Sequence, residues 1–218
     1  MNYSEALSFT FEDSQWVKKI AIGGLIALVS FCLLFMFAFI LVGYYVGVLR
    51  NVLKREAEPL PAWSDMGKIV VDGVLGTVIS FIYFVLIGGV CALLIVQVTS
   101  QPFMQETERV VLIVLISVST LLALGVFINF GLMQYAATQN FGAAFNVSDL
   151  HSLLKGHMGD YIAILVFSCI LNALLFLAGF GIISPFTNFW GMVVQAHLFG
   201  QCARALYPVQ PSVQSASA

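Results

Sequence analysis

Charge is scarce in this sequence of 218 residues: Asp, Glu, Lys and Arg together make up 9% of it. Soluble domains carry about 25% of these residues, because their surfaces must meet water. Hydrophobic residues make up 60%, and the mean hydropathy is +0.98. A chain with so little polar surface cannot cover a water-soluble body of this size. The composition therefore predicts an integral membrane protein, with lipid as the solvent for most of the polypeptide.

The marks of nucleic-acid binding and of redox or metal chemistry are also missing. The net charge is -2 and no basic run suggests nucleic acid, so we expect no such partner. The cysteines form no C-x-x-C pair and lie in apolar segments, so we interpret them as small buried hydrophobic residues: Cys32, Cys91, Cys169 and Cys202. No A-x-A-like cleavage site ends the first apolar segment, so we expect that segment to stay in the mature protein.

No Asp, Glu, Lys or Arg lies in the middle of any apolar run. Pumps and ion-coupled carriers usually keep such groups inside their spans, so the sequence disfavours that class. No Ser-His-Asp, Cys-His or paired-carboxylate arrangement occurs at a usable spacing. We therefore do not expect an enzyme, and we expect no catalytic site, no metal centre and no cofactor.

What the sequence has instead is a series of long apolar runs. A helix needs about 20 apolar residues to cross a bilayer, so the runs predict an all-α transmembrane bundle of about five or six embedded helices. Their expected positions are 20–49, 74–98, 110–134, 161–178 and 186–203. Gly179, Gly181 and Pro185 supply the break between the last two.

The first apolar run, residues 20–49, leaves two topologies open. Its thirty residues exceed one upright span, but two full spans need about 40. The absence of Gly and Pro between Ser30 and Val42 favours one long tilted helix. The alternative is a short hairpin that dips into the membrane and returns.

The densest charge cluster lies after this run, from Arg50 to Asp72. Because charge enters hydrocarbon only at a high free-energy cost, this stretch marks where the membrane stops. With one crossing at 20–49 the cations divide six to three, and with a hairpin eight to one, in both cases in favour of this loop. The positive-inside rule then predicts a multi-pass protein of the inner (plasma) membrane with the basic loop, residues 50–68, in the cytoplasm. The count favours the hairpin, with both termini cytoplasmic.

Three short amphipathic helices are expected to lead into spans on the cytoplasmic face. One begins at Ser64 or Asp65 as N-cap, a second near Ser148 repeats its pattern, and a weaker third copy begins near Trp16. Cations and tryptophans near these segments and near the far interface are typical of a membrane surface. The expected interface residues are Trp16, Lys18, Lys19, Arg50, Lys54, Arg55, Trp63, Lys68 and Trp190.

We assign residues 1–206 to a single integral membrane domain. Residues 207–218 contain prolines and small residues without apolar periodicity, so we expect a disordered C-terminal tail.

Several short motifs carry a resemblance to a known family. They are Phe11-Glu12-Asp13, Trp16-Val17-Lys18-Lys19-Ile20, Gly23-Gly24, Gly43-Tyr44 with Leu49-Arg50-Asn51-Val52, Leu60-Pro61 with Trp63 and Asp65, Val71-Asp72-Gly73, and Ala196-His197-Leu198-Phe199-Gly200-Gln201. With these the chain resembles domain-of-unknown-function family 4013, a set of prokaryotic polytopic membrane proteins. The resemblance covers nearly the whole chain and is most specific in the first seventy residues. Family members often carry Pro and Asn in a shorter first run, which suits a hairpin; this chain departs there. The family has no assigned activity, so the resemblance implies no catalytic residues.

Few residues are candidates for a functional site. Among the polar side chains at depth, Asn172 and Gln195 are the best candidates to line a polar path, although helix–helix hydrogen bonding is the ordinary role of such residues. His197 is the only histidine in an apolar span. It could ligate a haem or chlorin metal, or it could hydrogen-bond between helices with Gln201 one turn further on.

Two functions remain open. The first is a non-enzymatic scaffold or accessory subunit that packs against lipids, other membrane proteins or copies of itself. It rests on the lack of intramembrane charge and the abundance of small packing residues. The second is a permease or channel for a small neutral or lipid-like solute.

Overall fold

The computed structural model of the chain describes residues 1–33, 37–146, 148, 156–179 and 183–207. Within these residues the regular structure is helical and no strand occurs, which confirms the all-α prediction. The α-helices are α1 (Tyr3–Glu12), α2 (Trp16–Cys32), α3 (Ala38–Lys54), α4 (Met66–Thr99), α5 (Glu106–Thr138), α7 (Met158–Ala178) and α8 (Ser184–Leu206). Two short 3₁₀ turns, η1 (Trp63–Asp65) and η2 (Gly142–Phe145), precede α4 and follow α5.

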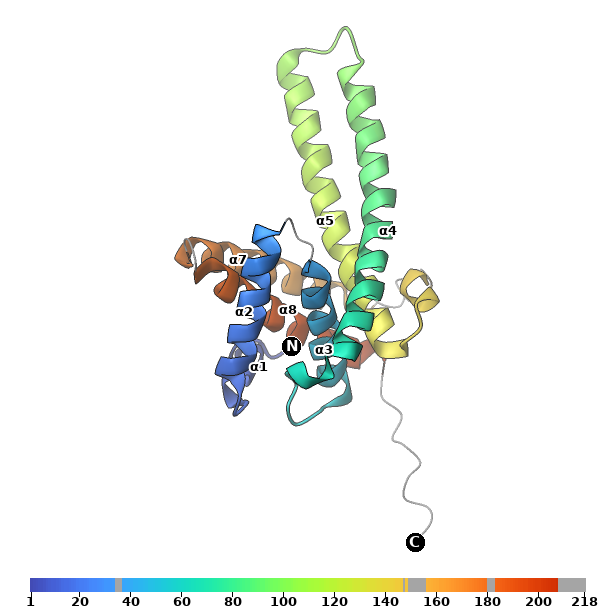
Figure 1. Ribbon diagram of the computed structural model, residues 1–218. Helices are drawn as coiled ribbons and strands as arrows, with labels where there is room; N and C mark the ends of the chain where they lie inside the picture. Colours follow the sequence, from blue (N-terminus) through green and yellow to red (C-terminus); the bar gives the residue numbers. More distant parts are fainter. Residues whose placement is uncertain (34–36, 147, 149–155, 180–182, 208–218) are drawn as a thin grey trace.

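Three helical hairpins build the molecule (Figure 1). They are α2–α3, α4–α5 and α7–α8. Helix α8 lies at the centre and packs against α1, α2, α3, α5 and α7. The core lies where α8 meets α3, around Leu49, Val52, Leu198 and Phe199, which are fully buried. The far half of the α4–α5 hairpin projects well beyond the other helices (Figure 1).

Residues 20–49 form a hairpin of two helices. Lys19, just before the run, donates from Nζ to the carbonyl oxygen of Leu60 at 3.0 Å, and the Trp63 indole donates to the carbonyl oxygen of Lys19 at 3.0 Å. These bonds bring the two ends of the run to the same side of the molecule. The described helices therefore have the shape of the hairpin alternative, although no Gly or Pro marks the turn; entry of this hairpin into a membrane stays a prediction.

Packing, not turn chemistry, determines this hairpin. Two glycines of α2 let α8 lie against it: a Cβ at residue 23 would overlap the ring of Phe189, and one at residue 24 would overlap the ring of Phe186. Helix α3 packs in turn on α4 and α8. Both halves of the run thus pack on α8, and α3 packs on α4 as well, which overrides the preference of an uninterrupted apolar sequence for one continuous helix.

The expected surface helix before the second span is instead the first part of α4. This helix runs without a break from Met66 to Thr99, and Asp65 sits at its N-cap position without a side-chain capping bond. Ile69 and Asp72 are buried, because α3 and α5 pack on this segment. Trp16 likewise begins α2, which runs straight on to Cys32. The third expected helix, near Ser148, falls outside the described residues except for Ser148 itself.

Three helical segments are long and apolar enough to cross a membrane: Trp63–Thr99, Glu106–Thr138 and Met158–Ala178. A fourth candidate is the pair Tyr3–Glu12 and Trp16–Cys32, which is bent by 100° at its break. The described residues thus support three to four spans, not the five or six embedded helices expected. The difference arises because α3 has only 17 residues, fewer than the roughly 20 that a full span needs, and α8 is less apolar than the three segments that qualify.

The C-terminal helices begin and end close to their expected positions. Gly179 caps the C-terminus of α7, and proline occupies the first turn of α8, so the predicted break between these helices is confirmed. The expected disordered tail, residues 207–218, lies outside the described residues from 208 onward.

Candidate functional site

Two glycines bring α3 and α4 into direct backbone contact. A Cβ at residue 43 would overlap the carbonyl oxygen of Ile69, and one at residue 73 would overlap the carbonyl oxygen of Phe39. The G-x-x-x-G pair of Gly43 and Gly47 therefore serves packing within the chain, since residue 47 in turn lies against Pro61. This close approach sets the distance between side chains further along the two helices.

Arg50, two turns after Gly43 on α3, reaches Asp72, which directly precedes Gly73 on α4. The Arg50 side chain is 2% exposed and forms a bidentate ion pair, with Nη1 2.7 Å from Asp72 Oδ2 and Nη2 3.0 Å from Oδ1. The Tyr135 hydroxyl, from α5, also donates to Asp72 Oδ1 at 2.9 Å. One carboxylate therefore ties together α3, α4 and α5, the three helices at the base of the long hairpin.

A second buried ion pair joins the N-terminal region to the basic loop. Lys19, 6% exposed as a residue, lies 2.6 Å from Asp13 Oδ2 and also donates to the carbonyl oxygen of Leu60. The other oxygen of Asp13 accepts from the backbone amide of Gln15 at 2.8 Å. Glu58 lies farther away, at 3.9 Å from Lys19, and its side chain is exposed. Lys19 is thus neutralised mainly by Asp13.

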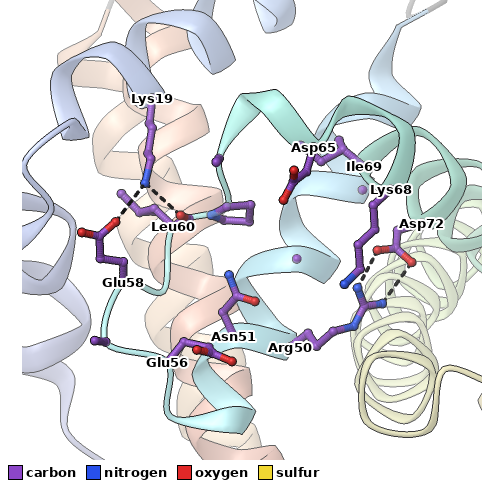
Figure 2. Close-up of a pocket in the computed structure, with 15 residues that line it drawn as sticks. Lys19, Arg50, Asn51, Glu56, Glu58, Leu60, Asp65, Lys68, Ile69 and Asp72 are labelled. Atoms are coloured by element: carbon purple, nitrogen blue, oxygen red, sulfur yellow. Dashed lines mark hydrogen bonds and ion pairs between the residues drawn. The ribbon is translucent and has the colours of Figure 1, made fainter.

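A charged cavity of about 360 Å³ lies between these two pairs (Figure 2). Figure 2 shows Lys19 and Leu60 on one side and Arg50 with Asp72 on the other. Exposed charged residues complete the rim: Glu56, Glu58, Asp65 and Lys68. Cations and carboxylates alternate around this cavity, so it carries no excess of positive charge for an anionic ligand.

The buried charges beside this cavity neutralise one another in pairs. Breaking either pair would leave a buried charge without a partner, which is costly in a medium of low dielectric constant. Among the described residues, Arg50 Nε is the one atom of the two pairs without a hydrogen bond. In the same residues no group of three or more His, Cys, Asp or Glu side chains is arranged to hold a metal ion. The arrangement is suited to fixing helices in position.

The profile of a family described as "Protein of unknown function (DUF4013)" matches residues 25–184. The chain belongs to this family. The match includes Arg50, Asp72 and Tyr135, but Asp13 and Lys19 precede it. Among curated proteins and among solved structures, none matches the chain. The matched range omits both ends of the chain, where some of the motifs that suggested the DUF4013 resemblance lie.

The expected membrane-interface residues of this DUF4013 member divide into two groups. Lys19 and Arg50 are buried and ion-paired, as described above. The remaining cations of the set, Lys18, Lys54, Arg55 and Lys68, are exposed. The three tryptophans are half-buried, with Trp16 edge-on to Phe11 and Trp63 stacked on Tyr44. Contact of the exposed residues with lipid headgroups stays a prediction.

His197, on α8, lies buried between this helix and α1. Its ring stacks on Phe9 with the centroids 4.1 Å apart, and Nδ1 lies 3.2 Å from Gln201 Nε2, the partner expected from the sequence. Burial and, to a smaller extent, the nearby Arg204 guanidinium together lower the pKa of His197 to about 4. The imidazole is therefore neutral near pH 7. Its use as a cofactor ligand stays a prediction.

Asn172 and Gln195 lie at different helix contacts. Asn172 donates to the carbonyl oxygen of Ser168 at 2.8 Å and faces Gly191 of α8. Gln195 points toward α5, where its Nε2 lies 3.5 Å from Asn129 Oδ1. The same Asn129 oxygen accepts from the Tyr45 hydroxyl at 2.7 Å. Both side chains thus contribute to helix–helix contacts, and a polar path lined by them stays untested.

The buried ion pairs escaped the sequence analysis. Lys19, Arg50 and Asp72 lie next to the ends of apolar runs, where solvated interface positions are the ordinary expectation, and Asp13 lies in the polar segment before the first run. The sequence did contain a signal for the Arg50–Asp72 pair. Arg50 follows Gly43 by two helical turns, and Asp72 directly precedes Gly73. A small residue in one helix and a charge two turns away on the same face indicate that the charge faces the neighbouring helix.

Proposed function

We propose that this protein is a non-enzymatic scaffold or accessory subunit of a larger membrane complex, and that its α4–α5 hairpin is the surface on which other membrane helices pack. The exposure of the far half of this hairpin carries the proposal. Phe84, Leu93 and Leu121 are each more than half exposed, and no other described helix lies beside this part of the hairpin (Figure 1).

The dimensions and small residues of the hairpin support this role. Helix α4 has 34 residues, which correspond to a length of about 50 Å, whereas the hydrocarbon core of a bilayer is about 30 Å thick. Gly88 and Gly89 lie in open space, with no atom within 4 Å of a Cβ built on either. In lipid, helices associate through close contact at small residues, because lipid and helix surfaces are equally apolar. This surface is thus suited to a partner helix.

The ion pairs at the base support a positional role for the hairpin. The Asp72 carboxylate links α3, α4 and α5, and so holds the hairpin at a fixed angle to the body of the protein. A scaffold needs such a fixed angle, because the geometry of its docking surface determines where a partner sits. The buried charges are satisfied by one another, which supports structural rather than catalytic use.

The proposal places the base of the molecule, including residues 50–68, on the cytoplasmic side of the inner membrane. The hairpin of α2 and α3 brings Lys19 beside Leu60, so the cations before and after this hairpin share one side. Arg109 lies near the opposite end, close to the tip of the α4–α5 hairpin. This distribution agrees with the positive-inside rule. If α2 and α3 also enter the bilayer, the embedded helices include these two with α4, α5 and α7.

Photo-crosslinking in intact cells tests the docking surface. A photoreactive amino acid at Leu93, which is 73% exposed, is expected to capture a second protein or a second copy of this chain. The captured protein must also co-purify at a fixed ratio in mild detergent. The same amino acid at Ile87, which packs partly against the core, is the matched control and should give only adducts within the chain. Adducts of Leu93 with lipid alone would contradict the proposal.

A further inference from the structure

A second cavity, which is apolar and measures about 820 Å³, lies between the tips of the α2–α3 and α7–α8 hairpins. Its volume falls within the range of about 300–1,000 Å³ that is typical of small-molecule sites. The lining includes aromatic rings such as Phe176 and Phe189, three polar residues (Ser30, Ser184 and Asn188) and no charged residue. The lining comes from α2, α3, α7 and α8, so the cavity is separate from the α4–α5 surface.

Ser30 is the polar residue of this lining that has no partner. It is 2% exposed, and its Oγ makes no hydrogen bond with any described residue. Ser80 of α4 and Ser117 of α5 bond to the carbonyl four residues earlier, of Gly76 and Ile113, both at 2.8 Å, whereas Ser168 of α7 is another buried hydroxyl without a partner. Ser30 lacks this bond. Its hydroxyl is buried at a cost in free energy unless a molecule in the cavity pairs with it.

The other two polar residues of the lining satisfy each other. The Asn188 amide nitrogen donates to the carbonyl oxygen of Ser184 at 2.8 Å and lies 2.9 Å from its hydroxyl oxygen. These contacts fix the first turn of α8 beside the cavity. Of the hydroxyls in the lining, Ser30 is thus the one that is both buried and without any hydrogen-bond partner among the described residues.

The position of Ser30 along α2 indicates whether its partner enters from water or from the membrane. Ser30 follows Lys19 by eleven residues, which at 1.5 Å per residue is about 16 Å along the helix. If Lys19 lies at the membrane surface, the hydroxyl lies near the middle of a hydrocarbon core about 30 Å thick. Water is scarce there, so the partner of Ser30 must be a molecule that dissolves in the membrane.

We propose that this cavity binds an uncharged lipid that carries a carbonyl group, with its chain against the aromatic lining and its carbonyl oxygen accepting a hydrogen bond from Ser30. The absence of charged residues from the lining excludes a charged headgroup, because an unpaired charge at this depth is costly. The site does not depend on the docking surface of α4–α5. Either proposal can therefore fail without the other.

The test uses the full chain in lipid nanodiscs with two photoreactive probes that share one chain. One is palmitic acid methyl ester with a diazirine in the chain; the other is the alkyl sulfonate of the same chain, which is permanently charged. Mass spectrometry locates the labelled peptides. The ester is expected to label peptides of α2 and α8 at the cavity, and the sulfonate is not.

Four variants determine whether the labelling reports the cavity. Ser30→Ala removes the hydroxyl and should weaken labelling about five- to tenfold, the effect of one lost hydrogen bond. Ala27→Phe places a ring in the cavity and should abolish labelling. Ser30→Thr keeps the hydroxyl and should retain labelling, which separates loss of the hydrogen bond from general damage. Ser117→Ala removes the same atoms from a hydroxyl bonded within its own helix, and should leave labelling unchanged.

Two results would overturn the proposal. Equal labelling by the ester and the sulfonate would mean that the cavity surface merely contacts bulk lipid. Unchanged labelling in both Ser30→Ala and Ala27→Phe would mean that the probe binds elsewhere.

Discussion

In the part of the chain that the structure describes, the buried Asp, Lys and Arg side chains are paired, and each pair helps to fix how neighbouring helices meet. Asp13 and Lys19 flank the bend between α1 and α2 and reach the loop at Leu60, while Arg50 and Asp72 join α3 to α4. A buried ion pair is not a strong net stabiliser, because desolvation offsets most of the attraction. Its larger effect is on specificity: any other helix register would leave one charge unpaired. The pairs therefore determine which arrangement of apolar helices the chain adopts.

Replacing Asp72 tests whether the Arg50–Asp72 pair holds the helices in this arrangement. Asp72→Asn leaves the Arg50 guanidinium buried without its counter-charge, and we expect a loss of about 3–5 kcal/mol in the free energy of unfolding. Tyr135→Phe removes one hydrogen bond to the same carboxylate and should cost about 1.5–3 kcal/mol. Unfolding of the purified protein in mild detergent, followed by tryptophan fluorescence, measures both. The double variant Arg50→Met with Asp72→Leu should recover much of the loss. An Asp72→Asn protein as stable as the parent would refute the role of this pair.

The buried His197 predicts how the stability of the folded protein depends on pH. Its pKa is lowered to about 4 in the folded protein, whereas an exposed histidine titrates near about 6.5. As the pH falls through this window the unfolded chain binds a proton that the folded protein does not, so stability declines between about pH 6.5 and pH 4 and is unaffected by this group above it. We expect His197→Gln to remove on the order of 2 kcal/mol of that decline. The readout is the difference in unfolding midpoint between parent and variant across pH, since carboxylates also titrate in this range. An identical pH dependence in the two proteins would contradict the prediction.

At the scale of elements, the contact between α3 and α4 depends on having no side chain at two positions. A Cβ at residue 43 would overlap the backbone of α4, which cannot move aside as a flexible side chain can. A larger residue at position 43 would therefore push α3 and α4 apart, at a cost in folding free energy. Separation of the helices would also pull Arg50 away from Asp72.

Gly43→Ala is expected to destabilise the protein by several kcal/mol, about as much as loss of the ion pair itself. The matched control is Gly67→Ala in α4, where a Cβ meets no atom within 4 Å. There the substitution should be neutral or stabilise by up to about 1 kcal/mol, because alanine favours the helix. The same fluorescence measurement applies. Equal behaviour of the two variants would show that the close approach of α3 and α4 does not limit stability.

The elements also show what the sequence could and could not predict. Apolar runs, with Gly179 and Pro185, predicted α7 and α8 to within a few residues, because these signals are local. The hairpin at 20–49 was left open because its turn has no local signal and depends on α2 packing against α8. The charged cavity was missed for a related reason: whether Arg50 faces solvent or Asp72 is decided by a partner 22 residues away. Apolarity alone likewise cannot distinguish α3 and α8, which are buried in protein, from α4 and α5, which are exposed.

At the scale of the whole molecule, the two ends of the long hairpin differ in character. The base carries the ion pairs and packs into the body of the protein, whereas the tip between α4 and α5 is a short polar loop that includes the 97% exposed Phe103. A pair of apolar helices about 50 Å long can cross a bilayer completely. Base and tip then lie on opposite sides of the membrane.

Cysteine labelling in intact cells tests this arrangement, in a background where the four natural cysteines are replaced. Phe103→Cys at the tip should react with a membrane-impermeant maleimide added outside. Glu56→Cys at the base should react only after the membrane is disrupted, because the proposed orientation has the cationic base on the cytoplasmic side. Both positions are exposed, so a difference in labelling reports sidedness and not burial. Labelling of Glu56→Cys from outside, with Phe103→Cys protected, would invert the proposed orientation. Labelling of both would mean that the hairpin does not cross the membrane.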